Sequence, residues 1–394
     1  MNVIYNISIW LYIISIRFSA LFKTKAKLWI EGRKDIFTRL ENALKESENI
    51  VWFHCASLGE FEQGKPIIEA YKLKYPTHQI LLTFFSPSGF ERCKNYKDAN
   101  WTFYLPADTK SNAKKMISIV KPIKTIFIKY EFWFNYMAEL KKENIPFYSV
   151  SAIFRNGQPF FKYNWWAKQL KNVTHFFVQD KSSADLLKSI GLNNTTISGD
   201  SRFDSVLANS QEPVTTPLIE NFSKRKPTII CGSTWPKDEI ILAKYIKVHP
   251  ENNYIIAPHE ILHISDLQKQ TDALLYSKAN KENILTTNVL IIDSIGLLSS
   301  IYQYGKLAYI GGGFGSGIHN ILEAVTFGLP VIFGSNYQKF NEATELINQN
   351  GAISISNYKE LTSAIDYFNV FDKSIAINYI QENSGATRSI IAHI

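Results

Sequence analysis

The stretch KLAYIGGGFGSGIHNILEAVTFGLPVIFG, from Lys306 to Gly334, combines an apolar strand, a glycine-rich turn, a helix and a second apolar strand. The helix is expected to start near Gly317 to His319. Two buried strands joined through a helix form a βαβ unit, and such units build parallel sheets with helices on both faces. The stretch therefore predicts an α/β fold.

The same alternation of short apolar runs and longer amphipathic runs extends over the whole chain. In the first half the predicted strands are IVWFHC, QILLTFF, TFYL, KTIFIK, PFYSVSA and HFFVQD, with helices in EQGKPIIEAYKLK, TKSNAKKMISIV and FWFNYMAELKKE. In the second half the predicted strands are PTIICG, YIIAP, VLIID, KLAYIG and LPVIFG. Helices are expected there after Trp235, near Ser294, after Gly317 and near Lys339.

A segment rich in Pro, Thr and charged residues, from Ser210 to Pro227, separates the two halves. We therefore expect two Rossmann-like domains, residues 23–210 and 211–394, after a separate N-terminal segment, residues 1–22. Ligands of such sheets bind beyond the carboxyl ends of the strands. The expected site is a cleft built from the loops that follow the strands of both domains.

The amino-acid composition excludes several classes of protein. The 394 residues are 45% hydrophobic, which excludes a disordered or fibrous chain. The cysteines, Cys55, Cys93 and Cys231, are too few and too scattered for a disulfide framework or a thiolate metal site, and they are predicted to be reduced core thiols. No acidic pair has the spacing of metal ligands. Neither an essential metal ion nor a bound cofactor is expected.

Positive charge is concentrated in the first half of the chain. Residues 1–204 hold 29 Lys and Arg against 18 Asp and Glu, whereas residues 205–394 hold 14 against 17. A solvated basic surface is the simplest interpretation. Nucleic acid is excluded as a partner because no helix-turn-helix, RNA-recognition or zinc-finger pattern is present. An acidic membrane surface or a phosphorylated substrate fits this charge better.

The N-terminal segment NVIYNISIWLYIISIRFSALF, residues 2–22, is mostly apolar and close to the length of about 20 residues that spans a bilayer. Basic residues follow it directly: Lys23, Lys25, Lys27, Arg33 and Lys34. Positive charge at this place keeps the rest of the chain cytoplasmic. The segment is expected to be membrane-associated, with an interfacial helix or a buried first helix as alternatives because polar residues interrupt it.

Glu60 follows the predicted strand IVWFHC within the turn ASLGE. It is expected at or just before the N-terminus of the next helix, where its carboxylate would face the cleft. A carboxylate at this place also stabilises a helix through its dipole, by about 0.3–1 kcal/mol. A catalytic base would need a partly desolvated pocket to recover the basicity that the dipole removes.

The glycine-rich turn GGGFGSG has five glycines in seven residues, among them Gly312, Gly313 and Gly315. Such a turn lets backbone amides approach a ligand, and a helix N-terminus beyond it favours an anion. A phosphate or carboxylate site is predicted here. An NAD site is disfavoured because the turn lies late in the chain and no acidic residue ends the next strand. Asn320 and Glu323 are expected on one helical face, within reach of a sugar or base hydroxyl.

Two further turns follow predicted strands of the second half. CGSTWPKDE places Ser233 and Thr234 before a proline that can start a helix, and IIAPHE ends a strand at Pro258 and His259. Each turn alone is explained as a helix start or a structural histidine. Together they are expected at the same end of the sheet as the glycine-rich turn.

Eight motifs in this order cover nearly the whole chain: HCASLGEFEQGKPIIE, LLTFFSPSGFE, KYEFW, FVQD, GDSRFD, CGSTW, DSIG and GGGFGSGIHNILEAVTFGLPVIFG. The chain resembles the 3-deoxy-D-manno-octulosonic acid (Kdo) transferase family, glycosyltransferases of lipopolysaccharide synthesis. The resemblance implies the two-domain glycosyltransferase-B fold and transfer of Kdo from CMP-Kdo to the lipid A precursor, lipid IVA. It also implies a last helix that returns to the first domain, and a place at the cytoplasmic face of the inner membrane.

By position in the motifs, Glu60 corresponds to the proton acceptor of the family. The family's CMP-binding residues correspond to Pro258 and His259, to Ile295, Gly296 and Leu297, and to Asn320, Ile321, Leu322 and Glu323. The chain departs from the family pattern at two places. It has APHEIL where the family usually has APRHPER, and Leu297 where the family often has a glutamate, so an arginine and an acidic contact are missing.

The resemblance implies a direct displacement that inverts the anomeric centre, with Glu60 as general base toward a hydroxyl of the acceptor. The glycine-rich amides, helix dipoles and Ser233 or Thr234 would stabilise the departing phosphate. Two alternatives share parts of the pattern. A sugar-nucleotide epimerase would share the fold but would not need the apolar N-terminus, and a non-catalytic protein that binds acidic lipids would not need Glu60. A soluble NAD enzyme fits least.

Overall fold

The computed structural model describes residues 2–260 and 264–394. The chain divides into two compact units. The first runs from the N-terminus to Ser205 and also contains Ser384–Ile394, and the second contains Val206–Asn383. The second unit is therefore inserted between two parts of the first.

A parallel seven-stranded sheet in the order β3-β2-β1-β4-β5-β6-β7 forms the centre of the first unit. Its strands are β1 Ile50–Cys55, β2 Gln79–Phe84, β3 Trp101–Tyr104, β4 Lys124–Ile128, β5 Phe147–Ala152, β6 His175–Val178 and β7 Thr195–Ile197. The first six were predicted, and the sequence analysis missed β7. This short strand lies at the sheet edge with half-buried and exposed side chains, so no apolar run marks it.

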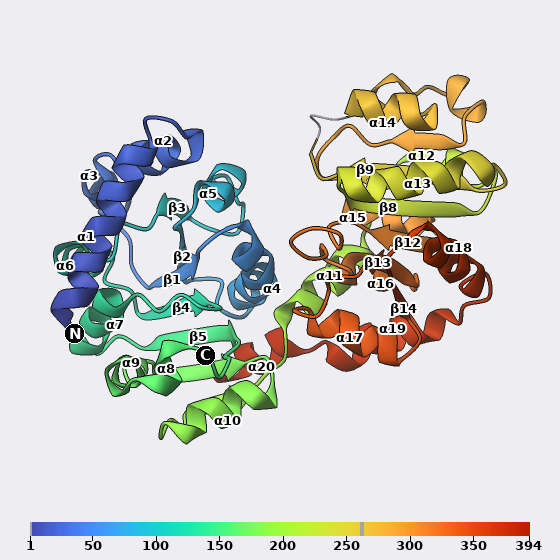
Figure 1. The fold of residues 1–394 in the computed structure, drawn as a ribbon. Helices are drawn as coiled ribbons and strands as arrows, with labels where there is room; N and C mark the ends of the chain where they lie inside the picture. Colours follow the sequence, from blue (N-terminus) through green and yellow to red (C-terminus); the bar gives the residue numbers. More distant parts are fainter. Residues whose placement is uncertain (1, 261–263) are drawn as a thin grey trace. The chain divides into compact units, whose positions relative to one another are not determined.

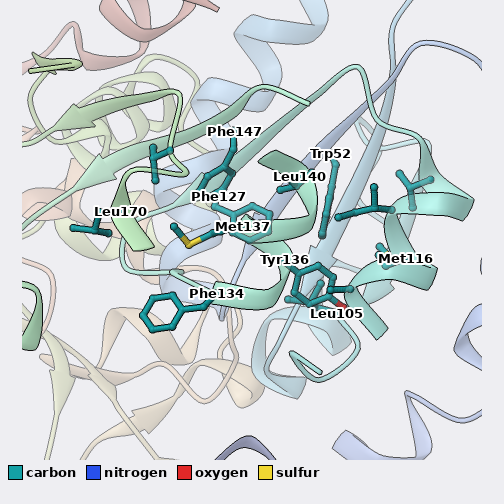
Figure 2. Close-up of a cluster of buried hydrophobic side chains, with 14 of the residues drawn as sticks. Trp52, Leu105, Met116, Phe127, Phe134, Tyr136, Met137, Leu140, Phe147 and Leu170 are labelled. Atoms are coloured by element: carbon teal, nitrogen blue, oxygen red, sulfur yellow. The ribbon is translucent and has the colours of Figure 1, made fainter. Parts of the chain in front are cut away.

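Helices cover this sheet (Figure 1). They are α1 Asn2–Ser19, α2 Thr24–Glu31, α3 Ile36–Ala43, α4 Leu58–Lys74, α5 Pro87–Cys93, α6 Lys110–Val120, α7 Phe134–Lys142, α8 Pro159–Lys162, α9 Asn164–Leu170, α10 Lys181–Ser189, the start of α11 Ser201–Gln211, and α20 Ala386–His393. Figure 2 shows the core between this sheet and α7. There the Trp52 and Phe127 rings pack edge to face, with 5.1 Å between their centroids. The Trp52 indole donates to the Thr83 hydroxyl at 2.8 Å, so this large buried ring has no unpaired polar group.

The other face of the sheet packs under α4 and α20. Ile67 and Ile68 of α4 join one apolar cluster with Ile390 and Ile394. Asp204 accepts hydrogen bonds of 2.6 Å from the amides of Gly385 and Thr387 and so caps the N-terminus of α20. The C-terminal helix is therefore part of the first unit's core.

A second parallel seven-stranded sheet has the order β10-β11-β9-β8-β12-β13-β14. Its strands are β8 Thr228–Thr234, β9 Asn253–Pro258, β10 Leu274–Leu275, β11 Val289–Ile291, β12 Leu307–Ile310, β13 Val331–Gly334 and β14 Ala352–Ile355. Helices of this unit are α12 Pro217–Ser223, α13 Pro236–Val248, α14 Ile264–Thr271, α15 Leu298–Ile301, α16 Leu322–Val325, α17 Asn341–Asn348, α18 Tyr358–Tyr367 and α19 Lys373–Asn383. The sequence missed the short edge strands β10 and β14.

Two predicted helix starts of the second unit are wrong. The helix expected at Gly317 to His319 begins at Leu322, and the helix expected near Ser294 begins at Leu298. Gly317 has φ +138°, outside the helical region, and the Asn320 side chain accepts from the Leu322 amide at 3.1 Å. Asn320 therefore ends the glycine-rich turn, and the helix follows after the N-cap residue Ile321.

The first helix, α1, packs on the first unit with only one face. Ile9 and Ile13 are buried in a cluster with Trp29 and Ala107. On the opposite side large apolar side chains are exposed: Val3, Ile4, Ile7, Trp10, Leu11, Ile14 and Phe18. Among the described residues no single helix has the length and hydropathy to cross a membrane, although α1 and α2 pass together as a pair bent by 119°.

Candidate functional site

Glu60 lies in the first turn of α4, at the carboxyl end of β1. The helix starts at Leu58, with Ser57 as N-cap residue. Glu60 is therefore the third helical residue, whereas it was expected at or just before the helix start. The Ser57 hydroxyl donates a hydrogen bond to Oε2 of Glu60. The Glu60 carboxylate is half-buried, and its orientation is fixed by Ser57, the N-cap residue of the same helix.

Charged groups gather around Tyr130, which follows β4. Burial raises the pKa of Tyr130, Arg155 and Arg202 lower it, and Glu60 and Asp200 raise it further. All four charged groups therefore act electrostatically on the Tyr130 hydroxyl. Arg202 is held by Asp200 through Nε and Nη2, at 2.8 and 2.7 Å from Oδ2.

The sequence analysis did not assign a role to Tyr130, Arg155, Asp200 or Arg202. Three of them share the feature that identified Glu60: Tyr130 follows β4, Arg155 follows β5 and Asp200 follows β7. Because β7 was missed, the position of Asp200 after a strand was not recognised. The post-strand rule was sufficient, but it was applied to too few strands.

A buried histidine supports the same end of the sheet. His54 on β1 contacts Thr83 through Nδ1, at 2.9 Å from Oγ1 and 3.0 Å from the carbonyl oxygen. Its Nε2 lies 3.4 Å from Oε2 of Glu131, and that oxygen also accepts from the Trp133 indole at 2.7 Å. Glu131 is therefore held between β1 and the start of α7.

In the second unit, the glycines of the turn are required by close backbone packing. A Cβ on Gly311 would lie 2.2 Å from the Ser233 carbonyl oxygen, and one on Gly313 would lie 2.5 Å from the Gly334 amide nitrogen. Gly312 has φ +94°, which an L side chain rarely adopts. The turn therefore packs tightly between the ends of β8 and β13.

Part of the predicted anion site is occupied by the protein itself. The Gly312 amide donates to Oδ2 of Asp238 at 2.9 Å, and the Gly315 amide donates to the Gly312 carbonyl at 2.9 Å. Asp238 is buried and also accepts from the Tyr309 hydroxyl at 2.7 Å. These two amides are unavailable to a phosphate, and the four-residue α16 adds little of the predicted helix dipole.

Asn320 and Glu323 do meet, although Asn320 precedes the helix. The Asn320 amide donates to Oε1 of Glu323 at 3.2 Å. Between them, the side chains of Ile321 and Leu322 are buried in the core, so only their backbone can reach a ligand. The predicted helical face is thus a capped turn that presents one amide and one carboxylate.

Three rings stack beside this turn. The Trp235 ring lies 4.6 Å from the His259 ring at an interplanar angle of 20°, and the His259 ring lies 4.4 Å from that of His319. The Trp235 indole donates to Nε2 of His319 at 3.0 Å. Burial, followed by the charge of His259, lowers the pKa of His319 to about 4, so His319 is neutral at pH 7. The sequence analysis assigned a role to His259 and none to Trp235 and His319.

The remaining predicted residues of this unit differ in accessibility. Ser233 has φ 52° at an irregular step between β8 and β9, and its side chain is half-buried. Thr234 is only 1% exposed and its hydroxyl donates to Glu239 at 3.0 Å. Pro258 ends β9, and the His259 amide donates to the Thr234 carbonyl at 2.9 Å.

The turn after β11 is open to solvent. Ile295 is 69% exposed, Gly296 has φ +95°, and Leu297 is the N-cap residue of α15. Of the APHEIL segment that departs from the family pattern, Ile261 and Leu262 lie outside the described residues. The described part of the second unit therefore keeps Ser233, His259, Ile295, Gly296, Asn320 and Glu323 accessible.

The sequence of the chain is similar to that of known proteins. Residues 32–205 match the family model described as 3-deoxy-D-manno-octulosonic-acid transferase (kdotransferase). A 3-deoxy-D-manno-octulosonic acid transferase of Aquifex aeolicus (strain VF5) is 28% identical over 337 residues, 82% of this chain and 87% of the relative. One of Rickettsia bellii (strain RML369-C) is 26% identical over 355 residues, 86% and 84% of the two chains. Over most of its length the chain is therefore similar to Kdo transferases.

Kdo transferases are glycosyltransferases of lipopolysaccharide biosynthesis. The matched residues 32–205 of this chain contain Glu60, Tyr130, Arg155, Asp200 and Arg202. The relatives align over most of the chain and so include the second unit.

Solved structures establish the fold. A UDP-GlcNAc 2-epimerase from Neisseria meningitidis has a TM-score of 0.61 at 13% identity, covering 87% of this chain and 98% of its own. A glycosyltransferase from Rickettsia africae ESF-5 has a TM-score of 0.57 at 13% identity, covering 88% and 98%. The protein thus has the predicted glycosyltransferase-B fold, with two Rossmann-like sheets.

Proposed function

We propose that the protein transfers Kdo from CMP-Kdo to lipid IVA, with Glu60 as general base and inversion at the anomeric carbon. The observation that carries this proposal is the position of Glu60. Its carboxylate is held by Ser57 at the carboxyl end of β1, and its charge acts on Tyr130 together with the charges of Arg155 and Arg202.

The chemistry requires a base and positive charge. The acceptor hydroxyl has an unperturbed pKa far above 7, so a carboxylate must take its proton as the new bond to the anomeric carbon forms. CMP leaves with the bonding electron pair and is a good leaving group. Arg155 and Arg202 add positive charge near the attacking group, where they can bind the acidic groups of Kdo or of a phosphorylated acceptor.

The second unit is proposed to bind the CMP moiety. The stacked rings of Trp235, His259 and His319 offer an apolar surface for a base, and Asn320 and Glu323 offer an amide and a carboxylate for hydroxyl groups. Ser233, Pro258, Gly313 and the turn from Ile295 to Leu297 complete the proposed set. No metal ion or cofactor is part of this proposal.

The protein is further proposed to act at the cytoplasmic face of the inner membrane. The exposed apolar side of α1 is suited to the acyl region, and the excess of basic residues in the first unit is suited to anionic headgroups. This placement would bring the first unit to a lipid acceptor.

The experiment that tests the transfer is product analysis by mass spectrometry. The protein is incubated with CMP-Kdo and lipid IVA dispersed in detergent, and with CMP-Kdo alone as control. A mass increase of one or more Kdo residues on lipid IVA, together with release of CMP, is expected. Release of CMP without any modified lipid would contradict the acceptor assignment, and turnover of UDP-GlcNAc in a parallel incubation would favour an epimerase.

A further inference from the structure

A pocket of about 610 Å³ lies in the first unit between α1, the α2–α3 segment and the start of α6. Its walls include Trp10 and Ile13 of α1 and Trp29 of α2, and basic side chains line it from three elements: Arg17, Arg33 and Lys115. Pockets of roughly 300–1,000 Å³ are typical of small-molecule sites. None of these residues belongs to the charged cluster around Glu60.

The pocket borders the exposed apolar face of α1. Trp10 is 55% exposed and lines the pocket, so the pocket is continuous with that face. α1 is mostly apolar, yet only Ile9 and Ile13 are buried. A helix of this kind needs an apolar environment on its other side, and an exposed apolar patch of this size marks an interaction surface.

Basic charge in the pocket is incompletely neutralised. The Arg33 guanidinium donates to three backbone carbonyls, those of Leu105, Trp29 and Phe85 at 2.7–3.0 Å, and it stacks over the Trp29 ring at 3.8 Å. Within the described part of the chain neither Arg33 nor Arg17 forms an ion pair. Burial lowers the pKa of Arg33 to about 9, so its charge persists at pH 7.

Other charges around the pocket are Lys115 and Asp35. Lys115 pairs with Glu41 at 3.6 Å on an exposed surface, an interaction that solvent weakens. Asp35 lines the pocket from the α2–α3 turn. Three basic side chains therefore face one acidic side chain, and the net charge favours an anionic ligand with an apolar part.

We propose that this pocket binds one acyl chain of an anionic phospholipid of the membrane, with the lipid phosphate at Arg17 and Lys115. The inference rests on the membrane placement under the proposed function and adds a specific lipid site to it. A bilayer phospholipid is the chosen occupant because α1, which forms one wall, is the segment that would lie in the bilayer surface. The bound lipid would join α1 to the rest of the first unit.

Tryptophan quenching tests whether a chain enters the pocket. The full-length protein is mixed with phosphatidylglycerol vesicles whose acyl chains carry bromine, which quenches indole fluorescence at contact. Trp29 is only 7% exposed and lines the pocket, so its quenching reports on bromine inside the pocket. Trp29→Phe is expected to remove a quenched component that Trp10→Phe leaves in place. If Trp29→Phe leaves the quenched fraction unchanged, no chain enters and the proposal is overturned.

Retained lipid tests the headgroup contacts. Protein taken from vesicles of equal parts phosphatidylglycerol and phosphatidylcholine is analysed by native mass spectrometry. One phosphatidylglycerol is expected to remain bound, and the Arg17→Gln, Lys115→Gln double variant is expected to retain it at least 5-fold less. The matched control Lys25→Gln, Lys114→Gln removes the same charge outside the pocket and is expected to retain the lipid. Equal retention by both double variants would overturn the headgroup assignment.

Competition separates the occupant from the acceptor. Addition of lipid IVA without CMP-Kdo is expected to leave the bound phosphatidylglycerol in place, and its displacement would overturn the choice of phospholipid. Wild-type transfer activity on detergent-dispersed lipid IVA is measured in parallel. Absence of transfer contradicts the proposed function, whereas loss of lipid retention and quenching contradicts only the lipid site.

Discussion

The Tyr5 hydroxyl donates a hydrogen bond of 2.5 Å to Oδ2 of Asp108, a contact that joins α1 to the first unit across 103 positions of sequence. Asp108 also accepts from the amides of Asn135 and Tyr136, both at 3.0 Å, at the start of α7. Burial raises the pKa of Asp108 to about 6 in spite of these donors. α1 is therefore tied to a buried, hydrogen-bonded carboxyl group and is more than a separate membrane segment.

Tyr5→Phe should destabilise the first unit by about 1–3 kcal/mol, because it leaves a buried carboxylate with one donor fewer. Chemical denaturation followed by fluorescence measures the change. Tyr12→Phe is the matched control, since Tyr12 is on the same helix, is partly exposed and keeps its ring contact with Phe85. Equal destabilisation by the two substitutions would show that the Asp108 contact contributes nothing specific.

Glu60→Gln should lower the rate of Kdo transfer by about 10²- to 10⁴-fold, the usual effect of losing a general base, while CMP binding is retained. The amide keeps the size of the side chain and its contact with Ser57. Glu62→Gln, on the exposed side of the same helix turn, provides the control and should be near wild type. A well-folded Glu60→Gln protein with normal turnover would contradict the mechanism.

Glu323→Ala should raise the KM for CMP-Kdo more than it changes the KM for the acceptor. The carboxylate, which accepts from Asn320, lies beside the glycine-rich turn of the second unit and is proposed to bind the donor. Steady-state kinetics with each substrate varied in turn give both constants. A raised KM for the acceptor with an unchanged KM for CMP-Kdo would mean that the two units have been assigned to the wrong substrates.

The pKa of His319 should be about 4, measurable by NMR titration of its ring with His319→Gln to assign the signal. Because this value is below the ordinary 6.5, the unfolded chain binds more protons than the folded chain between pH 4 and 6.5. The contribution of His319 to stability is therefore fully present above pH 6.5 and is lost as the pH falls toward 4. A ring that titrates near 6.5 would show that burial and the neighbouring His259 have no such effect.

Replacing Ile4, Ile7 and Leu11 with serine should weaken binding to anionic vesicles without unfolding the protein, because these side chains are exposed. Deletion of residues 1–22 would be a poorer test, since it also removes Tyr5, Ile9 and Ile13 from the folded unit. Vesicle flotation at low and high salt measures the effect. Each basic residue near an anionic surface adds roughly 1 kcal/mol, screened over about 8–10 Å.

High salt should therefore release the triple-serine variant more readily than wild-type protein. Replacement of Ser8 and Ser15 with asparagine, polar changes on the same helix, is the control and should leave binding unaltered. Equal binding of all variants to neutral and acidic vesicles at every salt concentration would contradict both the apolar and the electrostatic contribution.

The sequence predicted most of the sheet framework because buried parallel strands have continuous apolar runs. IVWFHC and QILLTFF are strands with few or no exposed residues, and they were located to within a residue. β7, β10 and β14 escaped because edge strands are short and partly exposed, so their composition resembles that of loops.

The candidate site was predicted less completely. Glu60, His259, Tyr130 and Arg155 all follow strands and could be found from local pattern, whereas their relation to Arg202 depends on separate loops that end at the same sheet edge. The glycines near Gly312 were predicted to bind an anion, but their spacing is equally required by backbone contacts with Ser233 and Gly334. Composition alone does not distinguish a glycine that binds an anion from one that close backbone packing requires.

The insertion of Val206–Asn383 between two parts of the first unit determines the order of folding during synthesis. A ribosome completes β14 and α19 before it makes α20, so the face of α4 that carries Ile67 and Ile68 emerges long before Ile390, which covers it. Nascent domains generally fold as they emerge. The second unit can therefore fold while the first still lacks its closing helix, and the nascent chain carries an uncovered apolar face until residues 384–394 are made.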